Sequence, residues 1–316
     1  DPRCNEDMAY PRRTSRQQRA RVAARLAHDH GGVVHRRDLL RLGVTRSDVR
    51  AERLAGRWEL LGRHTVRVAQ LEPHAQWWLA VWESGSAAHL DGAAALVASG
   101  LNGFQPARID ISLPRNNRRH RRSGVVLHQR LTMPPTLGAG VPRVRPDVAL
   151  VHAAAWAVSE RQAALLICLA VQQRLVPPQR LLRAWSAHQL AARGTRRTFL
   201  ATVVRDVGDG AHSLGELDFA LLCRRRGLPS PDRQVVVELE DGRVYLDVRW
   251  HGRELVVEVD GGHHALALNT VADALRQNEV VLTGSRVLRL PVLGLRLEAD
   301  AFMDQVARGL AQSAAA

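Results

Sequence analysis

The stretch Leu255–Asp260 constrains the fold more than any other, because it joins an apolar β-forming run to two carboxylates. Its apolar residues are typical of a strand buried in the centre of a sheet, where an unpaired carboxylate is costly. Since side chains alternate between the faces of a strand, Glu258 and Asp260 share one face. The sequence therefore predicts a buried strand with one acidic face.

A further carboxylate belongs to the strand expected just before this one. That strand is Val244–Trp250, and the turn His251–Arg253 brings Asp247 beside the acidic face. Three converging carboxylates repel one another unless a divalent cation neutralises them. Hard oxygen ligands select Mg²⁺ or Mn²⁺, which lower the pKa of a bound water and stabilise charge on a phosphate. On spacing alone, an acidic sheet edge that faces solvent remains the alternative.

The elements expected around these strands follow the order αβββαβα. A capping box begins the first helix at Ser213, and Gly227 ends it. The other expected elements are strands at Gln234–Leu239, Val244–Trp250 and Leu255–Val259, a helix around Val271–Thr283, a strand at Arg286–Leu290 and a helix at about Ala299–Gln312.

Several spaced motifs within residues 210–313 resemble one group of nucleases. They are Glu258-Val259-Asp260-Gly261-Gly262-His263-His264, Asp273-Ala274-Leu275-Arg276 and Val287-Leu288-Arg289-Leu290, with Ser213-Leu214-Gly215-Glu216, Gly227-Leu228-Pro229 and Gln234 upstream. The pattern is similar to bacterial domains related to the very-short-patch-repair endonucleases, within the PD-(D/E)xK nuclease superfamily. The resemblance implies a C-terminal PD-(D/E)xK nuclease-like core.

This resemblance also implies metal ligands. Asp247 is similar to the central metal-binding aspartate of the superfamily, and Glu258 to its second acidic ligand. The backbone carbonyl of Val259 would be a third ligand. Glu216 resembles the additional acid that many members place over the metal. The implied cofactor is Mg²⁺ or Mn²⁺.

One catalytic position departs from the superfamily pattern. Asp260 stands where the superfamily has Lys, and the chain contains no Lys. The role of activating water or stabilising charge then passes to His264, with Arg276 as the second choice. Histidine exchanges a proton near neutral pH, whereas arginine only stabilises charge.

The charge of the chain favours a polyanionic partner. All 45 basic residues are Arg, and the net charge is +14 with a pI of about 11.3. Guanidinium groups bind phosphates in a bidentate manner, which favours nucleic acid. Codon usage in a GC-rich genome explains the choice of Arg over Lys, but it does not explain the excess of positive charge.

Composition predicts a cytoplasmic location. The best candidate for a membrane helix, Ala163–Val171, is too short to span a bilayer, so we expect no membrane partner. The polar N-terminus predicts no signal peptide. Cys4, Cys168 and Cys223 are few and far apart, which predicts a reducing compartment and no cysteine zinc site.

The N-terminal region has the pattern of a winged helix. Helices are expected at Gln17–Ala27, within Val33–Leu42 and at Asp48–Leu54, followed by short strands at Trp58–Leu61 and His64–Val68. The motifs Gly32-Val33-Val34, Leu39-Leu40, Gly43-Val44 and Gly56-Arg57-Trp58-Glu59-Leu60-Leu61 are similar to the winged helix of AbiEi-type antitoxins, which binds operator DNA. The residues expected to contact DNA here are Arg46, Arg50, Arg53 and Arg57. An ordinary surface helix is the alternative.

The middle of the chain is expected to be an α+β domain. Arg108–Leu113 and Val125–Gln129 alternate like strands, so the basic run between them predicts a hairpin tip. Its candidate phosphate contacts, which a plain polar loop would also explain, are Arg115, Arg118, Arg119, Arg121 and Arg122. Pro134–Pro146 is interpreted as a linker. Helices are expected at Gln76–Trp82, Gly92–Ser99, Asp147–Ala157, Glu160–Gln173 and Pro178–Gln189.

We therefore expect an α/β multidomain protein. Its parts are a flexible N-terminus (1–14), a winged-helix DNA-binding domain (15–69), an α+β middle domain (70–209) and a PD-(D/E)xK-like nuclease domain (210–316). The expected function is a metal-dependent DNA endonuclease or nickase, and the resemblance implies mismatched, damaged or branched DNA as substrate. The alternative is a non-enzymatic DNA-binding regulator of antitoxin or repressor type with a vestigial nuclease fold.

Overall fold

The computed structural model of the chain describes residues 15–117, 122–188, 194–208, 219–238, 244–253, 255–260, 271, 274–275, 278 and 287–313. Helices and three sheets make it a mixed α/β protein. The chain divides into two compact units. The first comprises Asp1–Leu90 and Ala107–Arg143, and the second Asp91–Pro106 and Val144–Ala316. The domain boundaries expected from the sequence stay predictions.

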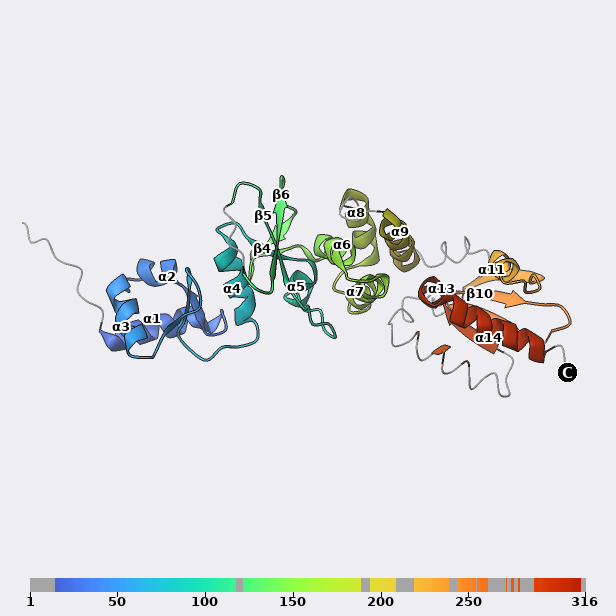
Figure 1. The fold of residues 1–316 in the computed structure, drawn as a ribbon, viewed down its shortest axis with the longest axis horizontal. Coiled ribbons are helices and arrows are strands. Elements are labelled where there is room, and N and C mark those ends of the chain that lie inside the picture. The colour runs from blue at the N-terminus through green and yellow to red at the C-terminus, as the bar shows by residue number, and fades with distance from the viewer. Residues whose placement is uncertain are drawn as a thin grey trace, which may run out of the picture. The chain divides into compact units, whose positions relative to one another are not determined.

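The N-terminal part of the first unit contains three helices and a small sheet (Figure 1). Its elements are α1 (Arg16–His28), β1 (Val33–His35), α2 (Arg36–Arg41), α3 (Arg46–Leu54), β2 (Glu59–Leu60) and β3 (Thr65–Arg67). The strands are antiparallel, in the order β1-β3-β2. Ser15 and Thr45 begin α1 and α3 with capping boxes, in which the hydroxyl accepts a backbone N–H three residues on. Val34, Leu39 and Trp58 lie in the buried core between these elements.

A five-stranded sheet follows, and it corrects two predictions. Its elements are α4 (Ala75–Ser84), β4 (His89–Asp91), β5 (Ile109–Pro114), β6 (Val125–Arg130), β7 (Thr136–Leu137) and β8 (Arg143–Val144), in the strand order β6-β5-β4-β8-β7. The expected hairpin is wrong, because β5 and β6 are parallel. Alternating side chains reveal a strand but not its direction. The expected linker Pro134–Pro146 is also wrong, because it contains β7 and β8, which are too short to show alternation.

Among the described residues of the second unit, five helices lie in the middle of the sequence. They are α5 (Gly92–Val97), α6 (Pro146–Trp156), α7 (Glu160–Gln172), α8 (Pro178–His188) and α9 (Gly194–Gly208), of which α9 was not predicted. The other four pack around α6, whose residues 147–154 are all buried. Within the described part of the chain, no helix combines the length and apolar character that crossing a membrane requires.

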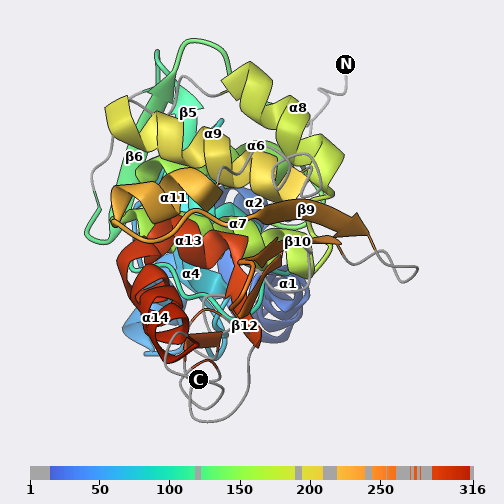
Figure 2. The ribbon, with the colours of Figure 1, turned by 90° about the vertical axis from the view of Figure 1, so that its right-hand side faces the viewer.

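The C-terminal part of the second unit is a sheet with helices. Its elements are α11 (Phe219–Arg225), β9 (Arg233–Glu238), β10 (Val244–Arg249), β11 (Val256–Asp260), β12 (Val287–Pro291), α13 (Val292–Leu297) and α14 (Ala299–Gln312). The strand order is β12-β11-β10-β9; β9, β10 and β11 are antiparallel, and β12 is parallel to β11. Figure 2 shows β9 and β10 side by side.

One face of this sheet is apolar and packs against α14. Leu246, Val257 and Leu288 point to this face and join a buried cluster with Phe302 and Val306 of the helix. The alternation of side chains along β10 and β11 therefore sends the polar residues of both strands to the opposite face. The predicted strands and the last helix are confirmed, whereas α13 was not predicted.

Candidate functional site

Two of the expected carboxylates are neighbours on the polar face of the C-terminal sheet. Asp247 of β10 lies directly opposite Glu258 of β11, and Asp260 lies opposite Tyr245 on the same face. Residues that face each other in this way have Cβ atoms about 4.5–5.5 Å apart. The predicted adjacency of Asp247 and Glu258 is therefore confirmed, whereas their roles as metal ligands stay predictions.

Each of these two carboxylates is bound by an arginine. The Nε of Arg249 lies 3.0 Å from both Oδ atoms of Asp247, and the Nε of Arg289 donates to Oε2 of Glu258 at 3.2 Å. Asp247 is only 3% exposed, so its negative charge needs a partner. The hydrogen bond to this carboxylate raises the pKa of Arg249.

Neither ion pair was predicted from the sequence. The pattern for the first was present, since Arg249 stands two residues after Asp247 on a predicted strand and hence on the same face. No sequence pattern indicated the second ion pair, because the pairing of Arg289 with Glu258 depends on the register of β12 against β11. That register is set by the tertiary structure.

The donor atoms of Asp247 and Glu258 fit one side of a site for a divalent cation. Both supply hard carboxylate oxygens from adjacent strands, and Val259 follows directly in the chain. Among the residues that the structure describes, no three His, Cys, Asp or Glu side chains are grouped so that they could hold a metal ion. The expected residues Glu216, His264 and Arg276 lie outside the described residues, as does His263.

The helix α3 separates its charges onto two faces. Asp48 and Glu52 are buried, at 7% and 3% exposure. Arg46, Arg50 and Arg53 are exposed, and their spacing places them on one side of the helix. None of these three arginines forms a hydrogen bond or an ion pair with another described residue. The outer face of α3 therefore carries uncompensated positive charge.

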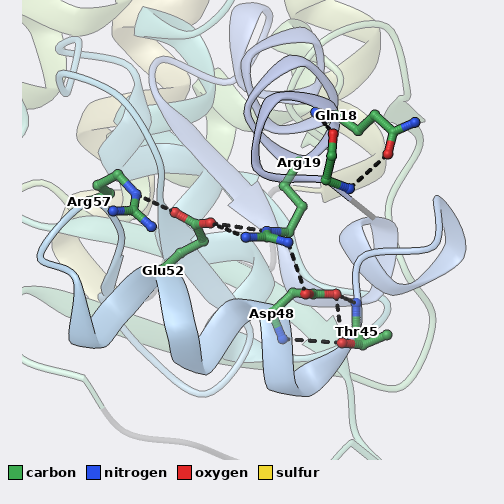
Figure 3. A network of polar contacts seen from close by, with 7 residues as sticks. Gln18, Arg19, Thr45, Asp48, Glu52 and Arg57 are labelled. Atoms are coloured by element: carbon green, nitrogen blue, oxygen red, sulfur yellow. Dashed lines mark hydrogen bonds and ion pairs between the residues drawn. The ribbon is translucent and has the colours of Figure 1, made fainter. Parts of the chain in front are cut away.

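Arg19 of α1 neutralises the buried acids of α3 (Figure 3). Its Nη1 donates to Oδ1 of Asp48 at 3.1 Å, while its Nη2 and Nε donate to Oε1 of Glu52 at 2.8 and 3.0 Å. Arg57 binds the second oxygen of Glu52. The hydrogen bonds from Arg57 and Arg19 lower the pKa of Glu52 despite its burial. Arg57, which was expected to contact DNA, thus has an internal partner.

The turn between β2 and β3 is held by α4. The carboxylate of Glu83 accepts the backbone N–H groups of Arg63 and His64 and the hydroxyl of Thr65, each at 2.8 Å. Burial alone would raise the pKa of Glu83, but these hydrogen bonds lower it. A Cβ at Gly62 would lie 2.6 Å from either oxygen of this carboxylate, so the contact requires glycine.

Part of the expected basic run lies near the same turn. Arg122 is exposed, and its Nη1 donates to the backbone carbonyl of Leu61 at 3.2 Å. Arg115 is exposed as well. The remaining candidates, Arg118, Arg119 and Arg121, lie outside the described residues. The predicted phosphate contacts of this run stay predictions.

No protein-family model matches the sequence, and no curated protein matches it.

Proposed function

We propose that the protein binds DNA through α3 and cleaves it at the Asp247–Glu258 pair as an endonuclease or nickase that depends on Mg²⁺ or Mn²⁺. The cross-strand register of these two carboxylates carries the proposal. A carboxylate as buried as Asp247 destabilises the fold unless a cation lies beside it. Neither side chain belongs to the apolar cluster on the other face of the sheet, so packing does not explain them.

The order of elements in the first unit supports the DNA-binding half of this proposal. Three helices with a small antiparallel sheet, in the order α1-β1-α2-α3-β2-β3 and with the strand order β1-β3-β2, support the proposed winged helix. In such a domain the third helix enters the major groove. Arg46, Arg50 and Arg53 would then bind phosphates and base edges.

The chemistry proposed for the carboxylate pair is phosphodiester hydrolysis. A bound Mg²⁺ or Mn²⁺ would lower the pKa of a water molecule and stabilise negative charge on the scissile phosphate. Asp247 and Glu258 would hold the ion, and the carbonyl of Val259 would add a third oxygen. Arg249 and Arg289, once released from the carboxylates, would lie close enough to bind phosphate oxygens.

The remaining parts of the mechanism are carried over from the resemblance. His264 would exchange a proton with the attacking water or the leaving oxygen, Glu216 would add a ligand, and Arg276 would stabilise charge. Asp260 replaces the lysine of the superfamily and lies on the same face as Glu258. Mismatched, damaged or branched duplexes are the candidate substrates.

A non-enzymatic DNA-binding regulator is the second candidate function. It is favoured by the ion pairs of Asp247 with Arg249 and of Glu258 with Arg289, which already neutralise the two carboxylates. In that case the same surface of α3 binds DNA, and the carboxylates serve only the stability of the sheet. The two candidates differ in whether the protein cleaves DNA and whether that cleavage requires Asp247.

A cleavage assay separates them. The full chain is incubated with plasmid, single-stranded, mismatched and branched DNA, with Mn²⁺ or with EDTA. We expect Asp247→Asn to slow cleavage by more than about 100-fold. Asp304→Asn, the same change at an exposed position of α14, should leave the rate unchanged. Circular dichroism checks that both variants fold.

Two results would overturn the enzymatic proposal in different ways. If the wild type binds duplex DNA but cuts none of the substrates, the regulator replaces the enzyme. If the wild type and Asp247→Asn cut equally fast, the protein is a nuclease with its site elsewhere.

A further inference from the structure

A basic hollow of about 690 Å³ lies in the first unit, beside α2, α4 and the β2–β3 turn. Arg36, Arg37, Arg46 and Arg63 line it. Among the described residues of the lining, Asp38 is the one acid, and it forms an ion pair with Arg41. The hollow is therefore electropositive and attracts an anion.

The wall of this hollow also contains aromatic rings. The rings of His35 and His64 are nearly parallel, with an interplanar angle of 4° and centroids 5.5 Å apart. The ring of Trp82 on α4 lies nearly perpendicular to the ring of His35, with centroids 5.5 Å apart, and Trp82 remains partly exposed. Arginines interleaved with such rings are the combination that binds nucleotides, because a base stacks on the ring while the phosphate is bound by the guanidinium groups.

His35 contributes a neutral ring to this wall. Its Nδ1 accepts the backbone N–H of Arg37 and so caps α2, which requires that this nitrogen carry no proton. Burial lowers the pKa of His35, in agreement with this role. The positive charge of the hollow therefore comes from its arginines.

The hollow shares two lining residues with a second hollow on the outer face of α3. Arg36 and Arg46 line both, and the other residues of the second hollow, of about 490 Å³, include Arg50, Arg53 and Leu54. A DNA strand on α3 would thus run along the rim of the larger hollow. One nucleotide turned out of that strand would face its aromatic wall.

We propose that this hollow binds a single unpaired nucleotide of the DNA that lies on α3. The base would stack on Trp82 and the histidine rings, and the arginines of the rim would hold the flanking phosphates. A volume of about 690 Å³ suits a ligand of this size. An unpaired nucleotide leaves the helix at a lower cost than a paired one, so the hollow selects duplexes with a bulge or a mismatch. The proposal rests on the proposed DNA binding by α3 and is independent of cleavage.

A binding assay with the full chain in EDTA tests the proposal. Two duplexes of the same sequence are compared, one fully paired and one with a single bulged 2-aminopurine. We expect the bulged duplex to bind about tenfold more tightly, since one stacked base contributes this much, and its fluorescence to be quenched. Trp82→Leu should remove the preference and the quenching without changing affinity for the paired duplex.

Two further variants make the result specific. Trp77→Leu is a matched control, because Trp77 is on the same helix but does not line the hollow. Arg63→Gln changes an exposed side chain of the rim and should reduce the preference for the bulge several-fold. If circular dichroism shows that Trp82→Leu does not fold, Arg63→Gln tests the proposal in its place.

Several outcomes would overturn the proposal. Equal affinity for both duplexes would do so, as would a preference that survives in both Trp82→Leu and Arg63→Gln. Tight binding of free deoxyadenosine monophosphate without any preference for the bulge would assign the hollow to a small nucleotide instead. Failure to bind any duplex would overturn DNA binding by α3 as well, whereas a bulge preference without cleavage would overturn only the enzymatic function.

Discussion

Asp247 lies directly opposite Glu258 across β10 and β11, and each of the two carboxylates is bound by an arginine of its own. The arginines offset both the repulsion between the carboxylates and the cost of burying Asp247. A divalent cation carries the same total charge as these two guanidinium groups. The proposed Mg²⁺ or Mn²⁺ would therefore compete with Arg249 and Arg289 for the two carboxylates, and that competition can be measured.

Removal of Arg249 should make the stability of the protein depend on metal. Without its guanidinium group the buried carboxylate of Asp247 loses this ion pair, so in EDTA we expect Arg249→Gln to lower the free energy of unfolding. Added Mn²⁺ should recover most of this loss in the variant and stabilise the wild type less. Thermal unfolding with and without Mn²⁺ measures both effects.

The control for this experiment is Arg225→Gln, which changes an exposed arginine of α11. It should leave both stability and the response to Mn²⁺ as in the wild type. An equal response to Mn²⁺ in the wild type and in Arg249→Gln would argue against Asp247 as a metal ligand.

Arg19 should be essential for the N-terminal core. Its replacement by Gln leaves the buried carboxylates of Asp48 and Glu52 without their shared partner, and we expect a loss of about 2–4 kcal/mol. Arg21→Gln, at an exposed position of the same helix, should change stability by less than about 0.5 kcal/mol. Urea unfolding measures the difference, and hydrogen exchange locates it in α1 and α3. Equal effects of both substitutions would contradict the bridging role of Arg19.

The contact between Gly62 and Glu83 can be tested by a double-mutant cycle. A methyl group at position 62 displaces the Glu83 carboxylate from its three hydrogen bonds, so Gly62→Ala should cost about 1–3 kcal/mol. In a Glu83→Ala background the same substitution should cost much less. Gly138→Ala is a matched control, since a Cβ there meets nothing within 4 Å. Additive losses in the cycle would rule out the proposed collision.

The positive face of α3 should govern the salt dependence of DNA binding. Arg50→Gln removes one of the proposed phosphate contacts, so affinity should fall at every sequence and the slope of log K against log salt should decrease by about 1. Arg21→Gln removes the same charge from the exposed side of α1 and should alter the slope less. Fluorescence anisotropy across a salt series measures both slopes. Indistinguishable slopes for the two variants would mean that net charge, and not α3, attracts the DNA.

Strands and helices with strong local patterns could be predicted from the sequence. β10 and β11 were predicted because β-branched residues alternate with polar ones and a short turn joins them. From these local patterns the position of Asp247 beside the acidic face of β11 followed as well.

Features that depend on distant parts of the chain could not be predicted. β5 and β6 are parallel because of the path that the chain takes between them. The alternation of side chains along a strand does not indicate that path. The partner of Arg57 depends on the burial of Glu52, which sequence spacing alone does not reveal. The basic hollow could not be predicted either, because it forms only where α2, α4 and the β2–β3 turn lie next to one another in the folded protein.

The separation of charge on α3 has a thermodynamic consequence. As a stretch of sequence the helix is nearly balanced, since Arg46, Arg50 and Arg53 alternate with Asp48 and Glu52. Folding buries the two acids against Arg19, whereas the three arginines of α3 remain exposed to solvent. The electric field that would attract DNA thus exists in the native state and largely vanishes on unfolding. By linkage, any polyanion bound there must also stabilise the fold, so that the ligand favours the very conformation that recognises it.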